Sequence, residues 1–237
     1  MLYRTLENEY TIFYWEKILI NPVGRPKLLD RDHLISIALQ EYWSYGIDNV
    51  SMTSIASLAK VSRPGIYKEF NDEDGLKYEV LKSYTNILRE HVIPQYNTSK
   101  DIKTLYYHFY STIGLEDCEK YFKGISKLQS LLTIPKKVKG CFFEGTKLKK
   151  HKLNSKTKRE LNNFEKYRKN ILLKYIKVMQ ETKQISSSMH VEEIYEFINA
   201  QLNLAQNLVL NGMDKKRMKL IIDKAFTAFV TPDCTIH

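Results

Sequence analysis

Residues 51–70, SMTSIASLAKVSRPGIYKEF, predict two short helices joined by a tight turn. Ser51 and Ser62 are favourable N-cap residues, and Pro64 falls in the first turn of the second helix, where its missing N–H is not needed. The apolar residues on the facing sides of the two predicted helices are Ile55, Ala56, Ala59, Ile66 and Phe70. This pattern is typical of a helix-turn-helix, whose second helix lies in the major groove of DNA.

The flanking sequence favours the same interpretation. Residues 24–81 resemble the DNA-binding head of the tetracycline-repressor (TetR) family of bacterial transcriptional regulators. The matched blocks are the GRPK arm at Gly24, the helix ending at Gly46, the block Ser51–Ala59, VSRPGIY at Val61 and the helix start Phe70–Leu76. The resemblance implies an all-α protein with a three-helix DNA-binding domain at 24–82 and a helical effector-binding and dimerisation domain at 83–237.

Residues 1–23 match nothing in the family. They are rich in apolar side chains such as Phe13, Trp15 and Ile18, which is unusual for a disordered tail. Two interpretations remain open: the segment packs as an extra element, or it is upstream sequence from a misassigned start. The intact mass of the protein made from its own gene would separate them.

The resemblance implies specific roles on DNA. Thr53 matches a backbone-contacting position, and Tyr67 and Lys68 match phosphate-binding positions. Arg63 matches a basic residue that grips guanine or phosphate at the start of the second helix. Ser62, Pro64 and Gly65 complete that groove-facing start. Because Gly65 has no side chain, sequence preference is expected to depend on its neighbours and on DNA shape.

Arg25 and Lys27 form a short basic arm before the first helix. Arms of this kind place arginine in the minor groove or on phosphates, so both residues are candidate DNA contacts. The alternative is a simple flexible terminus.

Three positions depart from the family pattern. Lys60 stands in the turn where glycine is common, and a left-handed lysine costs about 1 kcal/mol. Glu69 replaces an aromatic residue or histidine, and we expect it to stay off the DNA. The acidic run Asp72–Asp74 replaces a motif that usually carries a phosphate-binding lysine. These departures leave an alternative open: a helical ligand- or protein-binding module with a weakened DNA-binding head.

The basic charge of the chain lies outside the proposed head. The net charge is +10, yet residues 1–90 hold 11 basic and 13 acidic side chains, while residues 136–174 hold 14 basic and 3 acidic ones. The lysine-rich segment is interpreted as a solvated helix face. The alternative is a surface near DNA or one that binds an acidic ligand.

The body shows only successive helical stretches, predicted at 102–113, 118–132, from about 139, from a cap at Ser155, at 191–211 and at 214–230. Two late apolar stripes predict a homodimer interface; the alternative is intramolecular core. A two-fold dimer is the form in which helix-turn-helix proteins read palindromic operators. The candidate interface residues are Phe164, Ile171, Ile194, Ile198, Leu202, Ala205 and Val209.

The effector pocket cannot be assigned from sequence. A dense aromatic set lines either a pocket or the core: Tyr106, Tyr107, Phe109, Tyr110, Tyr121, Phe122, Phe142 and Phe143. Cys141 is either a redox sensor or a buried, inert thiol.

The six histidines and three cysteines show no metal-ligand spacing, and no nucleophile motif occurs, so neither enzyme, metal nor cofactor is predicted. We expect a cytoplasmic, ligand-responsive regulator that binds double-stranded DNA and an unknown small molecule. Repression is favoured over activation because blocking a promoter needs only occupancy.

Overall fold

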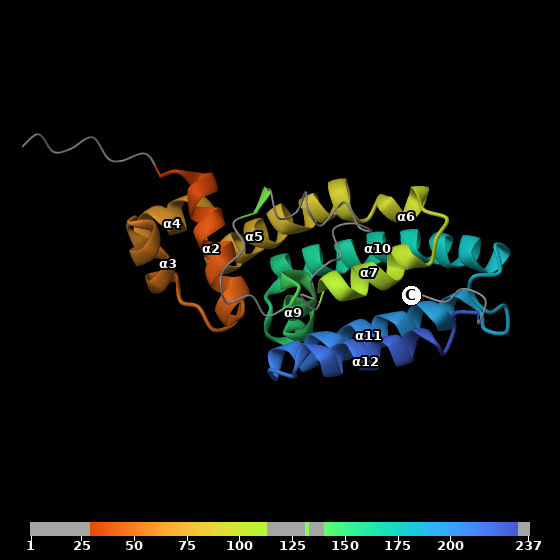
Figure 1. Ribbon diagram of the computed structural model, residues 1–237. Helices are drawn as coiled ribbons and strands as arrows, with labels where there is room; N and C mark the ends of the chain where they lie inside the picture. The colour runs from red at the N-terminus through yellow and green to blue at the C-terminus, as the bar shows by residue number, and fades with distance from the viewer. Residues whose placement is uncertain (1–28, 113–130, 133–139, 232–237) are drawn as a thin grey trace, which may run out of the picture. The chain divides into compact units, whose positions relative to one another are not determined.

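Figure 1 shows a computed structural model of the chain, which describes residues 29–112, 131–132 and 140–231. Contacts divide the chain into residues 1–30 and 31–237, and the account below concerns the second unit. Throughout its described ranges the regular structure is helical, apart from one antiparallel bridge between Ile185 and Val230. No helix in these ranges is long and apolar enough to cross a membrane.

The first three helices form the predicted helix-turn-helix head: α2 Arg31–Tyr45, α3 Met52–Ala59 and α4 Arg63–Phe70. The hydroxyl of Ser51 accepts a hydrogen bond from the Ser54 N–H, and that of Ser62 accepts one from the Gly65 N–H, each at 3.1 Å. Lys60 has the expected left-handed backbone, with φ 54°. Both predicted caps and the turn are therefore confirmed.

The core of the head contains the predicted apolar residues. They are all buried, as follows: Leu34, Ile35, Ala38, Leu39, Tyr42, Ile55, Ala56, Ala59, Ile66 and Phe70. Burying this many large side chains is the main stabilising term for so small a unit.

Helix α5, Glu73–Ile87, connects the head to the body and runs through the expected domain boundary at residue 82. The Asp72 carboxylate caps it by accepting a hydrogen bond from the Gly75 N–H at 2.7 Å. Gly75 is required because a Cβ there would lie 1.8 Å from the Phe70 carbonyl oxygen. The end of α4 and the start of α5 are thus in backbone contact.

Helix α5 does not continue as a regular α-helix as far as Pro94. After α5 the backbone widens into a π-helical turn, Leu88–Val92, where the Ile93 N–H donates to the Leu88 carbonyl at 2.8 Å. Helix α6, Gln95–Thr98, follows Pro94 at once.

The described body contains five further α-helices: α7 Lys103–Thr112, α9 Phe142–Leu148, α10 Ser155–Glu181, α11 Val191–Leu210 and α12 Lys215–Phe226. A 3₁₀ turn, Lys150–Lys152, separates α9 from α10. Helix α10 packs along α5 and α11, and α11 packs along α12 (Figure 1). The predicted helix at 118–132 lies almost wholly outside the described residues.

The cap of α10 was assigned to the wrong residue. Ser155 is the first helical residue, and Asn154 holds the N-cap position without a side-chain cap bond. The buried carboxylate of Asp74, in the first turn of α5, accepts from the backbone N–H groups of Lys156 at 2.9 Å and Thr157 at 3.1 Å. A carboxylate at this helix end also favours the positive end of its dipole.

Most of the predicted dimer stripe is core of the single chain. Phe164, Ile194, Ile198, Leu202 and Ala205 are each at most 3% exposed, so a second subunit has no access to them. The intramolecular alternative holds for these five residues. Ile171 and Val209 are half-buried.

Replacement of Asp74 tests the link between α5 and α10. We expect Asp74→Ala to lower the free energy of unfolding by about 2 kcal/mol, because two helical N–H groups lose their acceptor in a buried site. Urea denaturation followed by circular dichroism measures this change. Glu181→Ala, at the exposed far end of α10, is the matched control and should change stability by less than about 0.5 kcal/mol. Equal effects of the two variants would contradict the assigned role.

Candidate nucleic-acid interface

One surface of α4 is free to meet DNA. Ile66 and Phe70 bury the opposite side of this helix, while Arg63, Tyr67 and Lys68 are exposed. Thr53, near the start of α3, is exposed as well. The structure thus brings the implied DNA contacts of α3 and α4 onto the solvent side of one helix pair.

Arg63 is held over its neighbour one turn along. The guanidinium carbon lies 5.9 Å from the centre of the Tyr67 ring, and Nη2 donates to the Tyr67 hydroxyl at 3.4 Å. A cation over an aromatic face is favourable, and the contact limits the rotamers open to arginine. Arg63 would therefore lose less side-chain freedom on pairing with an acceptor group.

Ser62, Pro64 and Gly65 shape the start of α4. The Ser62 hydroxyl oxygen serves as the helix cap, and its hydrogen remains available to a phosphate oxygen. Pro64 occupies the first turn and is exposed. Gly65 is half-buried and has no side chain, so a DNA backbone or base edge meets little obstruction there.

Glu69 is paired with Arg31 at the surface of the head. Its carboxylate lies 3.0 Å from Nε of Arg31, whose Nη2 is 2.9 Å from Glu79 on α5. The guanidinium also stacks over the Phe70 ring, at 5.2 Å from its centre. The two carboxylates raise the pKa of Arg31, chiefly through the bond to Glu79, so the pairing persists at physiological pH. Sequence reasoning missed Arg31, whose partners lie on two other helices.

The acidic run at the start of α5 has structural uses. Asp72 caps α5, Asp74 caps α10, and Glu73 pairs with Lys77 one turn later at 2.6 Å. These bonds give each of the three acidic residues a structural role within the fold. The argument for a weakened head is reduced accordingly.

The basic body segment lies partly against the head. Lys152 pairs with Asp48, in the turn between α2 and α3, at 2.8 Å, and Lys149 lies 3.9 Å from the same carboxylate. Lys156 stacks over the Tyr78 ring of α5, at 4.5 Å from its centre. Lys152 and Lys156 nevertheless remain exposed, as in the solvated face that the sequence predicts. Arg25 and Lys27 lie outside the described residues.

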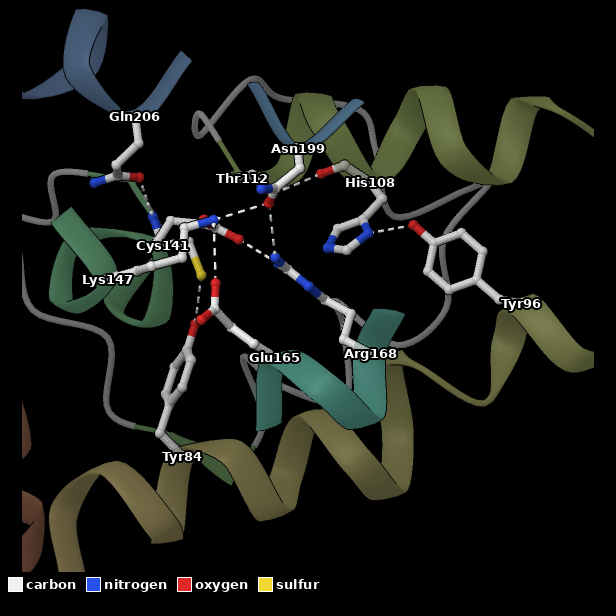
Figure 2. Close-up of polar contacts among 11 residues, drawn as sticks. Tyr84, Tyr96, His108, Thr112, Cys141, Lys147, Glu165, Arg168, Asn199 and Gln206 are labelled. Atoms are coloured by element: carbon white, nitrogen blue, oxygen red, sulfur yellow. Dashed lines mark hydrogen bonds and ion pairs between the residues drawn. The ribbon is translucent and has the colours of Figure 1, made fainter. Parts of the chain in front are cut away.

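A buried hydrogen bond joins the head to the residues before α9. The indole N–H of Trp43, on α2, donates to the Gly140 carbonyl at 2.8 Å. Gly140 has φ +75°, and a Cβ there would lie 2.3 Å from Oε1 of Gln206 on α11. The same Oε1 accepts from the Cys141 N–H at 3.0 Å (Figure 2). The head and α11 are therefore both bonded to the two residues before α9, Gly140 and Cys141. No sequence pattern indicated this junction.

Cys141 lies in this junction, next to the Tyr84 hydroxyl at 3.4 Å. Burial raises the pKa of its thiol, and the Glu144 carboxylate raises that pKa further. Among the described residues, no basic neighbour lowers the pKa of this thiol in turn. The thiolate is therefore rare at neutral pH. The geometry favours the inert-thiol interpretation over the redox sensor.

Much of the aromatic set is core. Tyr106, Phe109, Tyr110, Phe142 and Phe143 are all buried. The hydroxyl of Tyr106 donates to Asp223 of α12 at 2.5 Å, and Tyr110 donates to the same oxygen. Tyr107 is half-buried, while Tyr121 and Phe122 fall outside the described residues. Within the described part of the chain, no group of three or more His, Cys, Asp or Glu side chains is arranged to hold a metal ion.

Comparison with known sequences gives one partial match. No protein-family model matches the chain. The HTH-type transcriptional repressor ComR of Escherichia coli strain K12 is 33% identical over 61 residues, which are 26% of this chain and 29% of that relative. The match thus spans less than a third of the relative's length.

Solved structures match nearly all of the fold. A TetR-family regulator from Agrobacterium tumefaciens has a TM-score of 0.68 at 11% identity, over 85% of this chain and 97% of its own. A regulator from Saccharomonospora viridis in complex with choline has a TM-score of 0.63 at 14% identity, over 85% and 97%. The TetR-family regulator CifR, in complex with 26 base pairs of operator DNA, has a TM-score of 0.61 at 14% identity, over 87% and 100%.

The α3–α4 surface and the helical body define a two-part helix-turn-helix architecture. More particularly, the chain has the fold of the TetR-family transcriptional regulators, and these structural relatives are regulators rather than enzymes.

The raised pKa of Cys141 gives a reactivity prediction. At neutral pH we expect iodoacetamide to label Cys141 in the folded chain at least about tenfold more slowly than in urea, because the attacking thiolate is scarce and the side chain is half-buried. Peptide mass mapping distinguishes Cys141 from the other two cysteines. Labelling at the same rate in both states would show an accessible, reactive thiol.

Proposed function

We propose that the chain is a DNA-binding transcriptional repressor that reads a palindromic operator as a homodimer and is released by a small-molecule effector. It would act in the cytoplasm, where its operator lies. The observation that carries the proposal is the exposed start of α4, where a capped helix presents Arg63 beside Tyr67. The partial match to a repressor and the fold shared with an operator-bound regulator support it.

We assign the affinity for DNA to phosphate contacts and the preference for particular base sequences to Arg63. Thr53, Tyr67 and Lys68 offer one hydroxyl, one phenol and one ammonium to the DNA backbone, and such contacts fix the register of the helix. The guanidinium of Arg63 has the fork geometry that binds the major-groove edge of guanine. Arg25 and Lys27 are proposed as minor-groove or phosphate contacts of the arm.

The dimer surface is proposed on the outward sides of α11 and α12. Leu204 on α11 is 42% exposed and Leu220 on α12 is 59% exposed. The half-buried side chains of Leu208 on α11 and Ile221 on α12 lie between the same two helices. Exposed leucines beside further apolar side chains are typical of a surface that another subunit covers. This proposal replaces the five core residues of the sequence-based interface.

Effector release is proposed to act through the junction at Gly140. A molecule bound in the body would shift α9 or α11, and Trp43 would transmit that shift to the head. The choline complex of a regulator with this fold supports ligand binding as a property of such bodies. The alternative of a weakened head is not retained, since the acidic run serves as helix caps.

DNA binding is tested with the DNA flanking the chain's own gene, with excess nonspecific competitor and at two salt concentrations. Arg63→Ala should weaken specific binding about tenfold to a hundredfold, the loss typical of one base-reading arginine. Lys68→Ala should weaken specific and nonspecific binding alike and lower the salt slope by about one.

The control is Lys174→Ala, which removes the same charge from an exposed site on α10 and should leave binding unchanged. If the protein does not bind the flanking DNA, fragments that it does bind are selected from the whole genome, because the operator can be distant. The DNA-binding assignment would be contradicted if the protein binds neither the flanking DNA nor any genomic fragment. It would also be contradicted if Arg63→Ala and Lys174→Ala weaken DNA binding equally.

The oligomeric state provides a separate prediction. The double variant Leu204→Glu/Leu220→Glu should shift a dimer toward monomer, because two charges would be buried without partners at the contact. Light scattering after size exclusion measures the mass. Leu58→Glu, at an exposed leucine of the head, is the control and should remain dimeric. An unchanged mass in the double variant would place the dimer contact elsewhere.

A further inference from the structure

Three charged side chains lie deep in the body. Glu144 and Lys147 come from α9 and Arg168 from α10, and their side chains are only 2%, 8% and 4% exposed. Charged residues are rarely this buried unless they are paired or bind something. Figure 2 shows the labelled members, Lys147 and Arg168, converging on Asn199 of α11.

The contacts of this cluster are short and directional. Nη1 of Arg168 donates to Oε1 of Glu144, and Nζ of Lys147 lies 2.7 Å from Oε2 of the same carboxylate. Both cations also donate to Oδ1 of Asn199, Lys147 at 3.0 Å and Arg168 at 3.3 Å. One carboxylate and one amide oxygen are therefore shared by two buried cations.

The buried charges do not balance. Among the described residues, two cations face one buried anion, and the next carboxylate, Glu165, is 26% exposed and 4.0 Å from Lys147, while Lys150 also lies 3.6 Å from it. Nε of Arg168 is buried and has no hydrogen-bond partner. A net positive charge in the cluster and an unused donor on Arg168 are costly in the free protein. A ligand carboxylate that pairs with the two cations and reaches Nε would satisfy this donor while competing with Glu144.

The positive excess persists at physiological pH. Burial alone would raise the pKa of Glu144, but Arg168 and Lys147 outweigh it and lower that pKa to about 2, so this carboxylate stays ionised. Burial, with the charge of Arg168, lowers the pKa of His108 to about 4, so its imidazole is neutral. No proton uptake or release near pH 7 supplies the missing charge.

Aromatic side chains surround the guanidinium. Arg168 stacks over the Phe143 ring, at 5.2 Å from its centre, and Phe143 packs against Phe164 at 4.7 Å. The charge of Arg168 also acts on Tyr96 and His108, whose rings lie 5.6 Å apart. A cationic fork among aromatic rings suits a molecule with one anionic end and an apolar remainder.

We propose that the effector is a small organic carboxylate with an apolar body, bound by Arg168 and Lys147 in competition with Glu144. This inference rests on the proposed effector-responsive function and names its ligand class. A carboxylate that displaces Glu144 would act directly on α9, whose preceding residue Gly140 is bonded to Trp43 of the head. Binding of an anionic ligand at this cluster would thereby change the position of the DNA-binding helices.

The ligand class is tested by titration calorimetry on the full chain. The probes are benzoate and octanoate, their neutral analogues benzamide and octanamide, and their cationic analogues benzylamine and octylamine. At least one carboxylate should bind, and its neutral and cationic analogues should bind at least about tenfold more weakly, because they lack the charge that Arg168 pairs with. Binding by neither carboxylate, or equal binding by an amide, would overturn the proposal.

Variants assign the site. Glu144→Gln should tighten carboxylate binding about tenfold, because the competing anion is removed. The double variant Glu144→Gln/Arg168→Met removes the buried Glu144–Arg168 pair, leaves Lys147 with Glu165 4.0 Å away, and should abolish binding. Lys169→Met, the neighbouring exposed residue of α10, which pairs with exposed Glu196, is the control and should bind as the parent does. Unchanged binding in the double variant would overturn the assigned site.

The same preparations separate this inference from the proposed function. Calorimetry detects the carboxylate without DNA, and operator binding is measured without ligand. If the operator is bound and no carboxylate is, the ligand class is wrong and the regulator assignment stands. If a carboxylate is bound and no DNA is, the regulator assignment fails and the site stands.

Discussion

A single buried carboxylate connects the helix-turn-helix to the body. Asp74 caps α10 from the first turn of α5, and the next residue, Gly75, allows that turn to touch the end of α4. Because both contacts involve backbone atoms, they leave little freedom for α4 to move independently of α10. The acidic run that looked unfavourable for DNA binding therefore holds the helix-turn-helix in place, because Asp72 and Asp74 cap two helix ends.

Local signals in the sequence were sufficient for the head. Ser51, Ser62 and Asp72 act on N–H groups three residues away, and apolar residues at helical spacing identify the buried faces, so caps, turn and core could be predicted from neighbouring positions. The cap of α10 could not, because its acceptor lies 82 residues away at Asp74. Periodicity also finds an apolar stripe without saying what covers it, which is why Ile198 and its neighbours were assigned to an interface and lie in the core.

Charge was the least informative sequence signal. The excess of lysine and arginine after residue 136 suggested either a solvated face or a DNA-facing one, yet Lys152 and Lys156 contact the head and Arg168 lies in the core. Only the three-dimensional neighbours of each cation separate these cases. The same holds for Arg63, whose implied role came from family resemblance, while its support by the Tyr67 ring is visible only in the folded chain.

The bond between Trp43 and Gly140 gives the protein a built-in optical reporter. The chain has two tryptophans, and the described one has its indole 8% exposed, with its N–H bonded to a buried carbonyl. Indole emission moves to longer wavelengths when water reaches the ring. Any event that separates α2 from the residues before α9 would therefore change the colour of the intrinsic fluorescence, so loosening of the head is observable without attaching a dye.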